Sequence, residues 1–224
     1  MASINDDIIL IKNKTFVSNT YLICDKKENT CIVVDPGLDA DLLLAEIKAS
    51  NLKPLAVLST HGHFDHMGSA KNIQAEYTVP FYMHEADYKM SQSANFFLKV
   101  AGIQHSILTP KPDVLLKSNT ADLSIGSFTI GVHHLPGHSP GSCVFSWNNY
   151  LLTGDILYKN GLGPESIPKE DKQLLRDSIL KLFALFADQC IVLPGHGPHD
   201  SLGSIKTNNL ALKQFLDLKN DAAN

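Results

Sequence analysis

Three histidines and one aspartate crowd into the short segment His61-Gly62-His63-Phe64-Asp65-His66. The segment follows the apolar run 55–58, so we expect a buried strand that ends here and presents the segment as a loop at the edge of a sheet. Imidazole and carboxylate groups together suit zinc, iron, manganese or cobalt better than calcium or magnesium, which prefer oxygen ligands. The segment therefore predicts a metal site.

Three further residues of ligand type occur in a similar setting. His138, Asp155 and His196 each follow a short apolar run and stand among glycines and prolines, the composition expected where a strand ends in a tight loop. One loop rarely completes the shell of a first-row metal, which takes roughly four to six donors. We therefore expect four separate loops to bring their ligands to one edge of a sheet.

In these motifs and their order, the chain resembles the metallo-β-lactamase-fold hydrolases, and within them the glyoxalase II-like (hydroxyacylglutathione hydrolase-like) branch. The resemblance runs from the turn at Asp35-Pro36-Gly37 to Gly203. It implies that His61, His63 and His138 hold a first metal ion. It implies further that Asp65, His66 and His196 hold a second ion, that Asp155 bridges the two, and that Asp35 orients the loop from behind the ligands.

The residue types make hydrolysis plausible independently of the family. Two divalent ions about 3.5–4 Å apart can share one water, lower its pKa and polarise a carbonyl oxygen at the same time. Asp65 is the predicted catalytic partner of that bridging hydroxide, because a carboxylate beside metal ligands can accept a hydrogen bond from the attacking water. We expect two divalent ions, zinc first, with iron or manganese as alternatives, and a small thioester or ester as substrate.

Departures from related families narrow the function. His63 stands where flavodiiron oxidases, which resemble this motif, carry a carboxylate. Asp155 stands where several β-lactamases place a cysteine, which argues against antibiotic hydrolysis. Glyoxalase II enzymes place a cation and an aromatic residue at the positions of Pro164 and Ser166, and they continue into a helical domain that holds glutathione, whereas this sequence ends at Asn224. Poor recognition of glutathione is therefore expected.

Alternating strand and helix patterns support an α/β fold, a four-layer αββα sandwich formed by a single domain over residues 1–224. We expect strands near 8–12, 18–24, 30–34, 55–59, 80–83, 128–134, 142–147, 150–153 and 190–193. We expect helices at 39–49, 67–77, from Glu85, at 170–186 and at 204–218.

Residues near the motifs are weaker candidates for substrate binding. Tyr158 and Lys159 follow the bridging carboxylate and could anchor the substrate. The apolar segment 93–112 is interpreted either as a short helix and loop over the site, with Phe96 and Phe97 lining the pocket, or as plain packing or a dimer contact. His84 stands at a strand end, where a structural role is favoured over a ligand role.

Composition excludes several classes of partner. The formal net charge is −4 and the longest basic run is Lys26-Lys27, so nucleic acid is not expected as a partner. The apolar run 8–11 is too short for a signal peptide or a membrane span, and the four cysteines are scattered as expected of reduced thiols, so we predict a cytoplasmic enzyme of a small-molecule substrate. A homodimer remains open.

Other functions stay open at this stage. The same loops resemble those of an iron-dependent persulfide dioxygenase, which would use one iron held by His61, His138 and Asp155. A lactonase would need nearly the same ligands. A catalytically idle binding module normally goes with eroded ligands, and none is eroded here.

Overall fold

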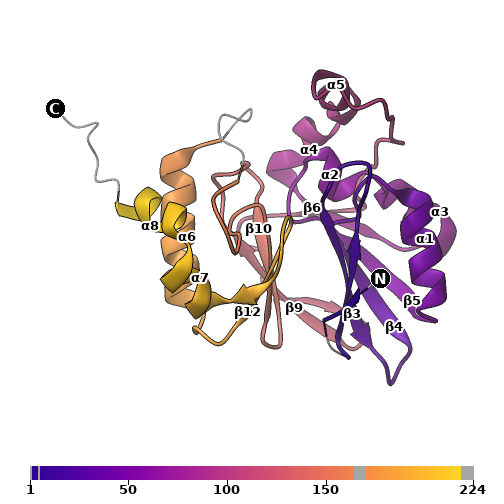
Figure 1. The fold of residues 1–224 in the computed structure, drawn as a ribbon. Helices are drawn as coiled ribbons and strands as arrows, with labels where there is room; N and C mark the ends of the chain where they lie inside the picture. The colour runs from indigo at the N-terminus through magenta and orange to yellow at the C-terminus, as the bar shows by residue number, and fades with distance from the viewer. Residues whose placement is uncertain (1, 5, 164–169, 218–224) are drawn as a thin grey trace.

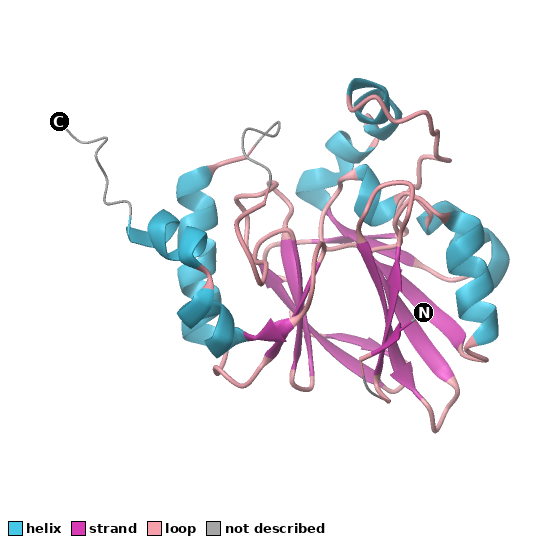
Figure 2. Cartoon of the chain, in the orientation of Figure 1, coloured by secondary structure: helices cyan, strands magenta, loops and turns pink. Residues whose placement is uncertain are grey.

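The computed structural model describes residues 2–4, 6–163 and 170–217. Two mixed sheets lie face to face, and helices cover the outer face of each (Figure 1, Figure 2). This is the predicted four-layer αββα sandwich. Among the described residues, no helix has both the length and the apolar character needed to cross a bilayer.

The first sheet has the strand order β1-β2-β3-β4-β5-β6-β7. Its strands up to β4 pair antiparallel, and β4 to β7 pair parallel. Their bounds are β1 Ala2–Ser3, β2 Ile8–Lys12, β3 Asn19–Asp25, β4 Thr30–Val34, β5 Lys53–Leu58, β6 Phe81–His84 and β7 Val114–Leu116. The helices joined to this half are α1 Ala40–Ala49, α2 Phe64–Met67, α3 Ala70–Tyr77, α4 Glu85–Ser91 and α5 Ala94–Val100.

The second sheet has the order β13-β12-β11-β10-β9-β8, with only β11 and β12 paired parallel. Its strands are β8 Leu123–Ile125, β9 Phe128–His134, β10 Cys143–Trp147, β11 Tyr150–Gly154, β12 Ile191–Pro194 and β13 Asp200–Ser201. Helices α6 Lys172–Leu185, α7 Leu202–Asn208 and α8 Leu210–Asp217 cover its outer face, at the left of Figure 1.

Side-chain alternation along the strands produces three hydrophobic layers. In β4, Ile32 and Val34 face the second sheet, while Cys31 and Val33 face the helices of the first half. A third layer lies between the second sheet and helices α6 to α8. The buried cysteines belong to these layers and all four cysteines are free, as expected of small hydrophobic side chains.

Two predicted helices are each interrupted. The helix predicted at 67–77 breaks between α2 and α3, because Ser69 donates its amide to Pro36 O and its hydroxyl to Gly37 O. The helix predicted at 204–218 breaks at Asn209, whose side-chain oxygen accepts the Leu212 amide of α8. The short strands β1, β7, β8 and β13 were not predicted, since two or three residues carry too little pattern.

Strand direction brings the candidate ligands together. The carboxyl ends of β4, β5 and β6 meet at one edge of the first sheet, and those of β9, β11 and β12 meet at the facing edge of the second. Hydrogen bonds join the two sheets there, from Cys143 N to Thr60 O (2.8 Å) and from Asn19 N to Gly195 O (2.8 Å). The loops that follow these strands therefore face one another.

Candidate metal centre

Three imidazole nitrogens converge at the centre of this edge. His61 Nε2 lies 2.9 Å from His63 Nδ1, and His138 Nε2 lies 3.2 Å and 3.1 Å from these two atoms. Burial lowers the pKa of all three histidines, that of His138 to about 3, so they are neutral and each offers a lone pair. In a tetrahedral shell with bonds of 2.0–2.1 Å, nitrogen donors stand about 3.3 Å apart, close to the spacing found.

A second group of donors lies beside the first. Asp65 Oδ2 is 3.3 Å from His66 Nε2 and 3.2 Å from His196 Nε2. Asp65 and His66 are buried on α2, whereas His196 reaches the centre from the loop after β12. His196 donates Nδ1–H to Val17 O, which leaves Nε2 free to face the carboxylates.

Asp155 lies between the two groups. Its Oδ1 is 3.3 Å from His66 Nε2, and its Oδ2 is 3.4 Å from His196 Nε2 and 3.6 Å from His138 Nε2. His66 Nε2 and Asp155 Oδ1 are buried and form no hydrogen bond within the described ranges. Buried polar atoms normally have a partner, and an ion bound among these donors would supply one. The donor set therefore fits one or two divalent ions.

The electrostatics of the second group also favour a cation. Burial raises the pKa of Asp155, but the charge of His66, a hydrogen bond from His196 and the charge of His138 together outweigh burial and hold that pKa well below its ordinary value. Burial lowers the pKa of His196, but hydrogen bonds to Asp155 and Asp65 raise it to about 10. The two ionised carboxylates thus attract positive charge to this side of the centre, which a divalent ion would provide.

Asp35 supports both groups from behind. Its Oδ2 accepts from His66 Nδ1 (3.0 Å) and from Thr60 Oγ1 (2.8 Å), and Oδ1 accepts from the Thr60 amide (2.7 Å). Because Thr60 Oγ1 donates to Asp35, it can accept from His61 Nδ1, 3.0 Å away. One carboxylate thereby sets which nitrogen of His61 and of His66 points to the centre, the role expected of residues behind a ligand shell.

Asp87 ties two ligand loops together, and sequence analysis missed it. This buried carboxylate of α4 accepts the Gly62 amide (2.9 Å) and the Ser139 hydroxyl (2.6 Å) on Oδ2, and the Gly141 amide (2.7 Å) on Oδ1. A Cβ on Gly141 would stand 2.7 Å from the carboxyl carbon, so only glycine fits. The signal in the sequence that could have pointed to Asp87 is its place as an acidic residue in the first turn of a helix that follows a strand.

The backbone of Gly195 packs directly against two of the donor side chains. A Cβ at this position would lie 2.3 Å from Asp155 Oδ1 and 2.4 Å from His66 Cε1. No side chain can occupy this space while the two ligands keep their places. The backbone of the β12 loop thus forms one wall of the candidate metal centre.

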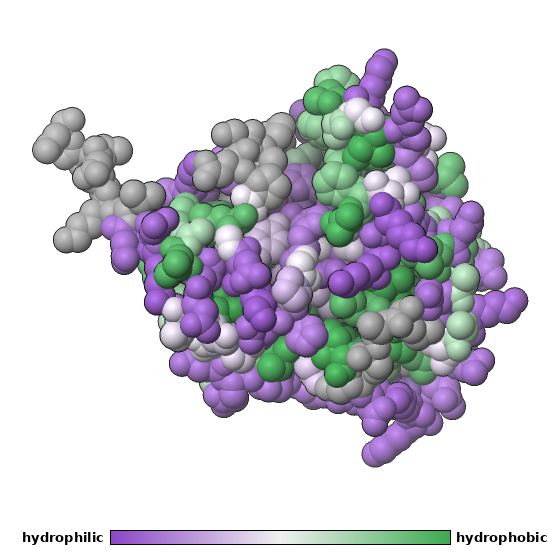
Figure 3. All heavy atoms as spheres, in the orientation of Figure 1, coloured by the Kyte–Doolittle hydropathy of each residue, from purple (hydrophilic) through white to green (hydrophobic). Residues whose placement is uncertain are grey.

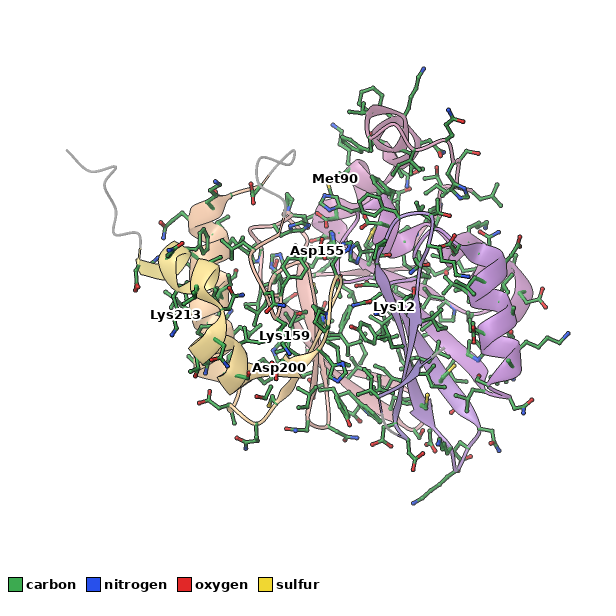
Figure 4. The ribbon with its side chains drawn as sticks, in the orientation of Figure 1. Lys12, Met90, Asp155, Lys159, Asp200 and Lys213 are labelled. Atoms are coloured by element: carbon green, nitrogen blue, oxygen red, sulfur yellow. The ribbon has the colours of Figure 1, made fainter. Side chains whose placement is uncertain are left out.

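Tyr158 and Lys159 follow Asp155 and differ in their surroundings. The Tyr158 hydroxyl is buried and has no hydrogen-bond partner within the described parts of the chain. Burial raises the pKa of Tyr158 and Asp155 raises it further, so the phenol is neutral. Lys159 instead pairs with Asp200 (3.1 Å), and Figure 4 shows these two side chains below Asp155.

Asn209, between α7 and α8, holds the loop that carries Tyr158. Asn209 donates its side-chain amide to Tyr158 O (3.2 Å) and Gly161 O (2.8 Å). The predicted departures at Pro164 and Ser166 lie outside the described residues.

A cavity of about 1250 Å³ opens onto the donors. His63, Asp65, His138, Asp155 and His196 line one part of it, and Tyr158 and Lys159 line the part next to them. Phe96 and Phe97, on α5, line the part beside α4. The helix of the 93–112 segment thus borders the cavity, whereas the described cavity lining includes no residue of the loop at 102–112. Met90 of α4 lies on the α5 side of Asp155 (Figure 4).

The other candidate histidine, His84, stays apart from the donors. Its Nδ1 accepts the Ala86 amide at the start of α4, and its ring stacks on His134 with centroids 4.0 Å apart. These contacts give His84 the structural role that was favoured.

Comparison with known proteins adds to this geometry. A family model of the Metallo-beta-lactamase superfamily matches residues 13–222. Hydroxyacylglutathione hydrolase GloC of Haemophilus influenzae is 30% identical over 206 residues, which cover 91% of this chain and 96% of GloC. BLEG-1 B3 metallo-beta-lactamase is 30% identical with a TM-score of 0.82, covering 92% of this chain and 99% of BLEG-1. TTHA1623, in a di-iron-bound form, is 30% identical with a TM-score of 0.80, covering 90% and 98%.

Proposed function

Because this chain belongs to the metallo-beta-lactamase superfamily, whose members bind divalent metal ions, we propose that it is a binuclear metal-dependent hydrolase of a small thioester or ester. The observation that carries the proposal is the position of Asp155. Its two oxygens contact donors of both groups, and its Oδ1 and the facing His66 Nε2 are buried without a hydrogen bond in the described chain.

The ligand assignment follows from these contacts. His61, His63 and His138 would hold one ion, and Asp65, His66 and His196 the other. Asp155 would contact both. The mixed nitrogen and oxygen donors suit zinc first, with iron or manganese as alternatives. When bound, the pair of ions would supply a water of lowered pKa and polarise the substrate carbonyl.

Asp65 would orient the attacking water. Burial raises the pKa of Asp65, but His66 and a hydrogen bond to His196 lower it more, so the side chain is an ionised acceptor. It also lines the cavity, where a substrate would lie. A carboxylate placed this way can accept a hydrogen bond from the water and hold its proton as the carbonyl is attacked.

Tyr158 would donate to the substrate. Tyr158 lines the cavity next to Asp155, and its neutral hydroxyl is buried without a hydrogen-bond partner in the described chain. A donor that is already in place can stabilise the negative charge that develops on the carbonyl oxygen or on the leaving group. Lys159 is a weaker candidate as a substrate anchor, because Asp200 already engages its ammonium group.

The relatives support different parts of this proposal. The name of GloC supports thioester hydrolysis, and the di-iron form of TTHA1623 supports two metal ions and keeps iron in view. The likeness to BLEG-1 makes a β-lactam a necessary comparison. Outside the candidate metal centre, Lys14 and Lys159 are the charged side chains along the described cavity wall. Because Asp200 already engages Lys159, this wall offers the two carboxylates of glutathione mainly Lys14.

A substrate panel with protein of known metal content tests the function. Lactoylglutathione, other small thioesters, a simple ester, a lactone, a β-lactam and a persulfide would be compared under air, with oxygen uptake recorded. Fastest turnover of a thioester or ester without oxygen uptake supports the proposal. Oxygen uptake with the persulfide, or fastest turnover of the lactone or the β-lactam, would replace it.

A further inference from the structure

One wall of the cavity exposes large apolar side chains. Phe96 is 63% exposed, Val100 69% and Val17 69%, and all three line the cavity together with Phe16 and Phe97. In Figure 3, hydrophobic side chains gather over the upper right of the molecule, where Figure 1 places α4 and α5. Exposed apolar side chains that cluster on a concave surface mark a binding site more often than scattered ones do.

The orientation of α5 explains this exposure. Ala94 and Leu98, one turn apart, are buried in the core of the first half. Phe96 and Val100, also one turn apart, therefore point away from that core and toward the cavity. Burial of Ala94 and Leu98 packs α5 against the core, and Phe96 and Val100 remain outside that core.

The apolar wall adjoins the candidate metal centre at Phe16. The ring of Phe16 packs edge-on against Phe64, with centroids 5.4 Å apart, and against His196 at 6.1 Å. Phe64 belongs to the same short helix as Asp65 and His66. The loop that carries Phe16 is also held in place, because the Thr15 amide donates to Asp39 (3.1 Å).

Charge is scarce along this part of the cavity. Within the described lining, the charged groups outside the candidate metal centre are Lys14 and Lys159, and Lys159 is paired with Asp200. An uncharged group placed between α5 and the 14–17 loop would bury apolar surface, and the exposed Lys14 of that loop can keep its ammonium group in water.

We infer that the acyl group of the substrate is large and apolar, an alkyl chain of several carbons or an aromatic ring, and that it lies between the 14–17 loop and α5. This inference rests on the proposed hydrolysis of a thioester or ester and specifies its substrate class. The carbonyl would lie at the candidate metal centre beside Tyr158, and the chain would run past Phe16 to Phe96 and Val100.

A chain-length series tests the inference. N-acetylcysteamine thioesters with lactoyl, acetyl, butanoyl, hexanoyl and octanoyl groups share one leaving thiol and differ only in the acyl group. Since burial of one methylene favours binding by a factor of about three to four, kcat/KM should rise by about that factor per methylene up to hexanoyl or octanoyl. The Phe96→Ala and Val100→Ala variants should each lower kcat/KM for octanoyl about tenfold and leave that for acetyl within about twofold.

Leu185→Ala is the matched control, because Leu185 is also exposed (51%) and lies outside the cavity lining. It should leave the series unchanged. A flat series, or a preference for lactoyl, would overturn the inference while the proposed function stands. A steep series that neither α5 variant alters would overturn it as well, as would a dimer that the α5 variants dissociate without changing the series.

A binding measurement separates this inference from the proposed function. S-alkyl thioethers of N-acetylcysteamine lack the thioester carbonyl, so the enzyme cannot cleave them at sulfur. Calorimetry with them therefore measures binding in the cavity without turnover. Affinity that grows with alkyl length and falls in Phe96→Ala supports the apolar subsite even if no thioester is turned over. Equal affinity for ethyl and octyl thioethers overturns it.

Discussion

Replacement of Asp87 by asparagine is predicted to weaken metal binding from behind the ligands. Asp87 is fully buried and joins the histidine segment, through Gly62, to the His138 loop, through Ser139 and Gly141. Asparagine keeps the size of the side chain but replaces one acceptor oxygen with a donor. At least one of the three groups that donate to Asp87 then faces the NH2 group of the asparagine. The remaining hydrogen bonds are made to a neutral oxygen instead of a carboxylate oxygen.

The magnitude follows from these contacts. Hydrogen bonds to a charged group contribute about 1.5–3 kcal/mol each, neutral ones about 0.5–1.5 kcal/mol, and a buried donor left unpaired costs about 1–3 kcal/mol. Loss of one bond and weakening of two others should lower the free energy of unfolding by about 3–5 kcal/mol. Residues that orient ligand loops typically change metal affinity by about 10–100-fold.

Two measurements check the prediction: urea unfolding of the metal-free protein, and zinc affinity by competition with a chromophoric chelator. Asp113→Asn is the control, since Asp113 accepts the Phe81 amide (2.9 Å) and the Gln74 side chain (2.7 Å) away from the candidate metal centre. It should lower stability without changing zinc affinity. Ser139→Ala removes one contact of Asp87 and should show a smaller loss in both measurements. Wild-type zinc affinity in Asp87→Asn would refute the claim that Asp87 positions the ligand loops.

Three further predictions concern catalysis and stability. Asp65→Asn should lower turnover by on the order of a hundredfold while the circular dichroism spectrum stays unchanged. His105→Ala, at an exposed site, should change turnover little. Near-normal turnover of Asp65→Asn would exclude the proposed role of Asp65. Tyr158→Phe should lower kcat at least about tenfold with KM little changed, because the hydroxyl would donate to the developing negative charge. Stability should not fall, because the buried hydroxyl has no partner in the described chain. A changed KM with unchanged kcat would instead mean that Tyr158 binds the substrate and the transition state equally. Burial, with His134 stacked beside it, lowers the pKa of His84 from 6.5 to about 4, so as the pH falls the unfolded chain takes up this proton first. Stability present above pH 6.5 should therefore be lost between pH 6.5 and 4, by up to about 3 kcal/mol, and urea titrations of His84→Asn should show a smaller pH dependence.

The positions of the candidate ligands were predictable because the segments that carry them follow strands. In β5, β11 and β12 an apolar run ends at a glycine-rich or polar loop, and parallel strands bring such loops to one edge. The family resemblance and the four-layer fold are confirmed by the matched family model and by the two packed sheets. These features depend on local patterns, which a single sequence contains.

Contacts between distant segments were not predictable in the same way. Asp87 contacts residues 25 and 52 positions away, and Asn209 contacts the Tyr158 loop 51 positions away. Neither residue belongs to a motif. Asp87 lies in the first turn of α4 and Asn209 between α7 and α8, positions that many polar residues occupy. The interruption at Ser69 has the same origin, since its partners lie in the loop after β4.

The number of metal ions in the purified protein decides whether the candidate metal centre is binuclear. After dialysis against metal-free buffer, elemental analysis by mass spectrometry gives the number of ions bound per chain. Seven donor side chains exceed what one tetrahedral ion uses, so we expect about two first-row ions per chain. A single iron without zinc, or no retained metal after loading with excess zinc, would contradict this expectation.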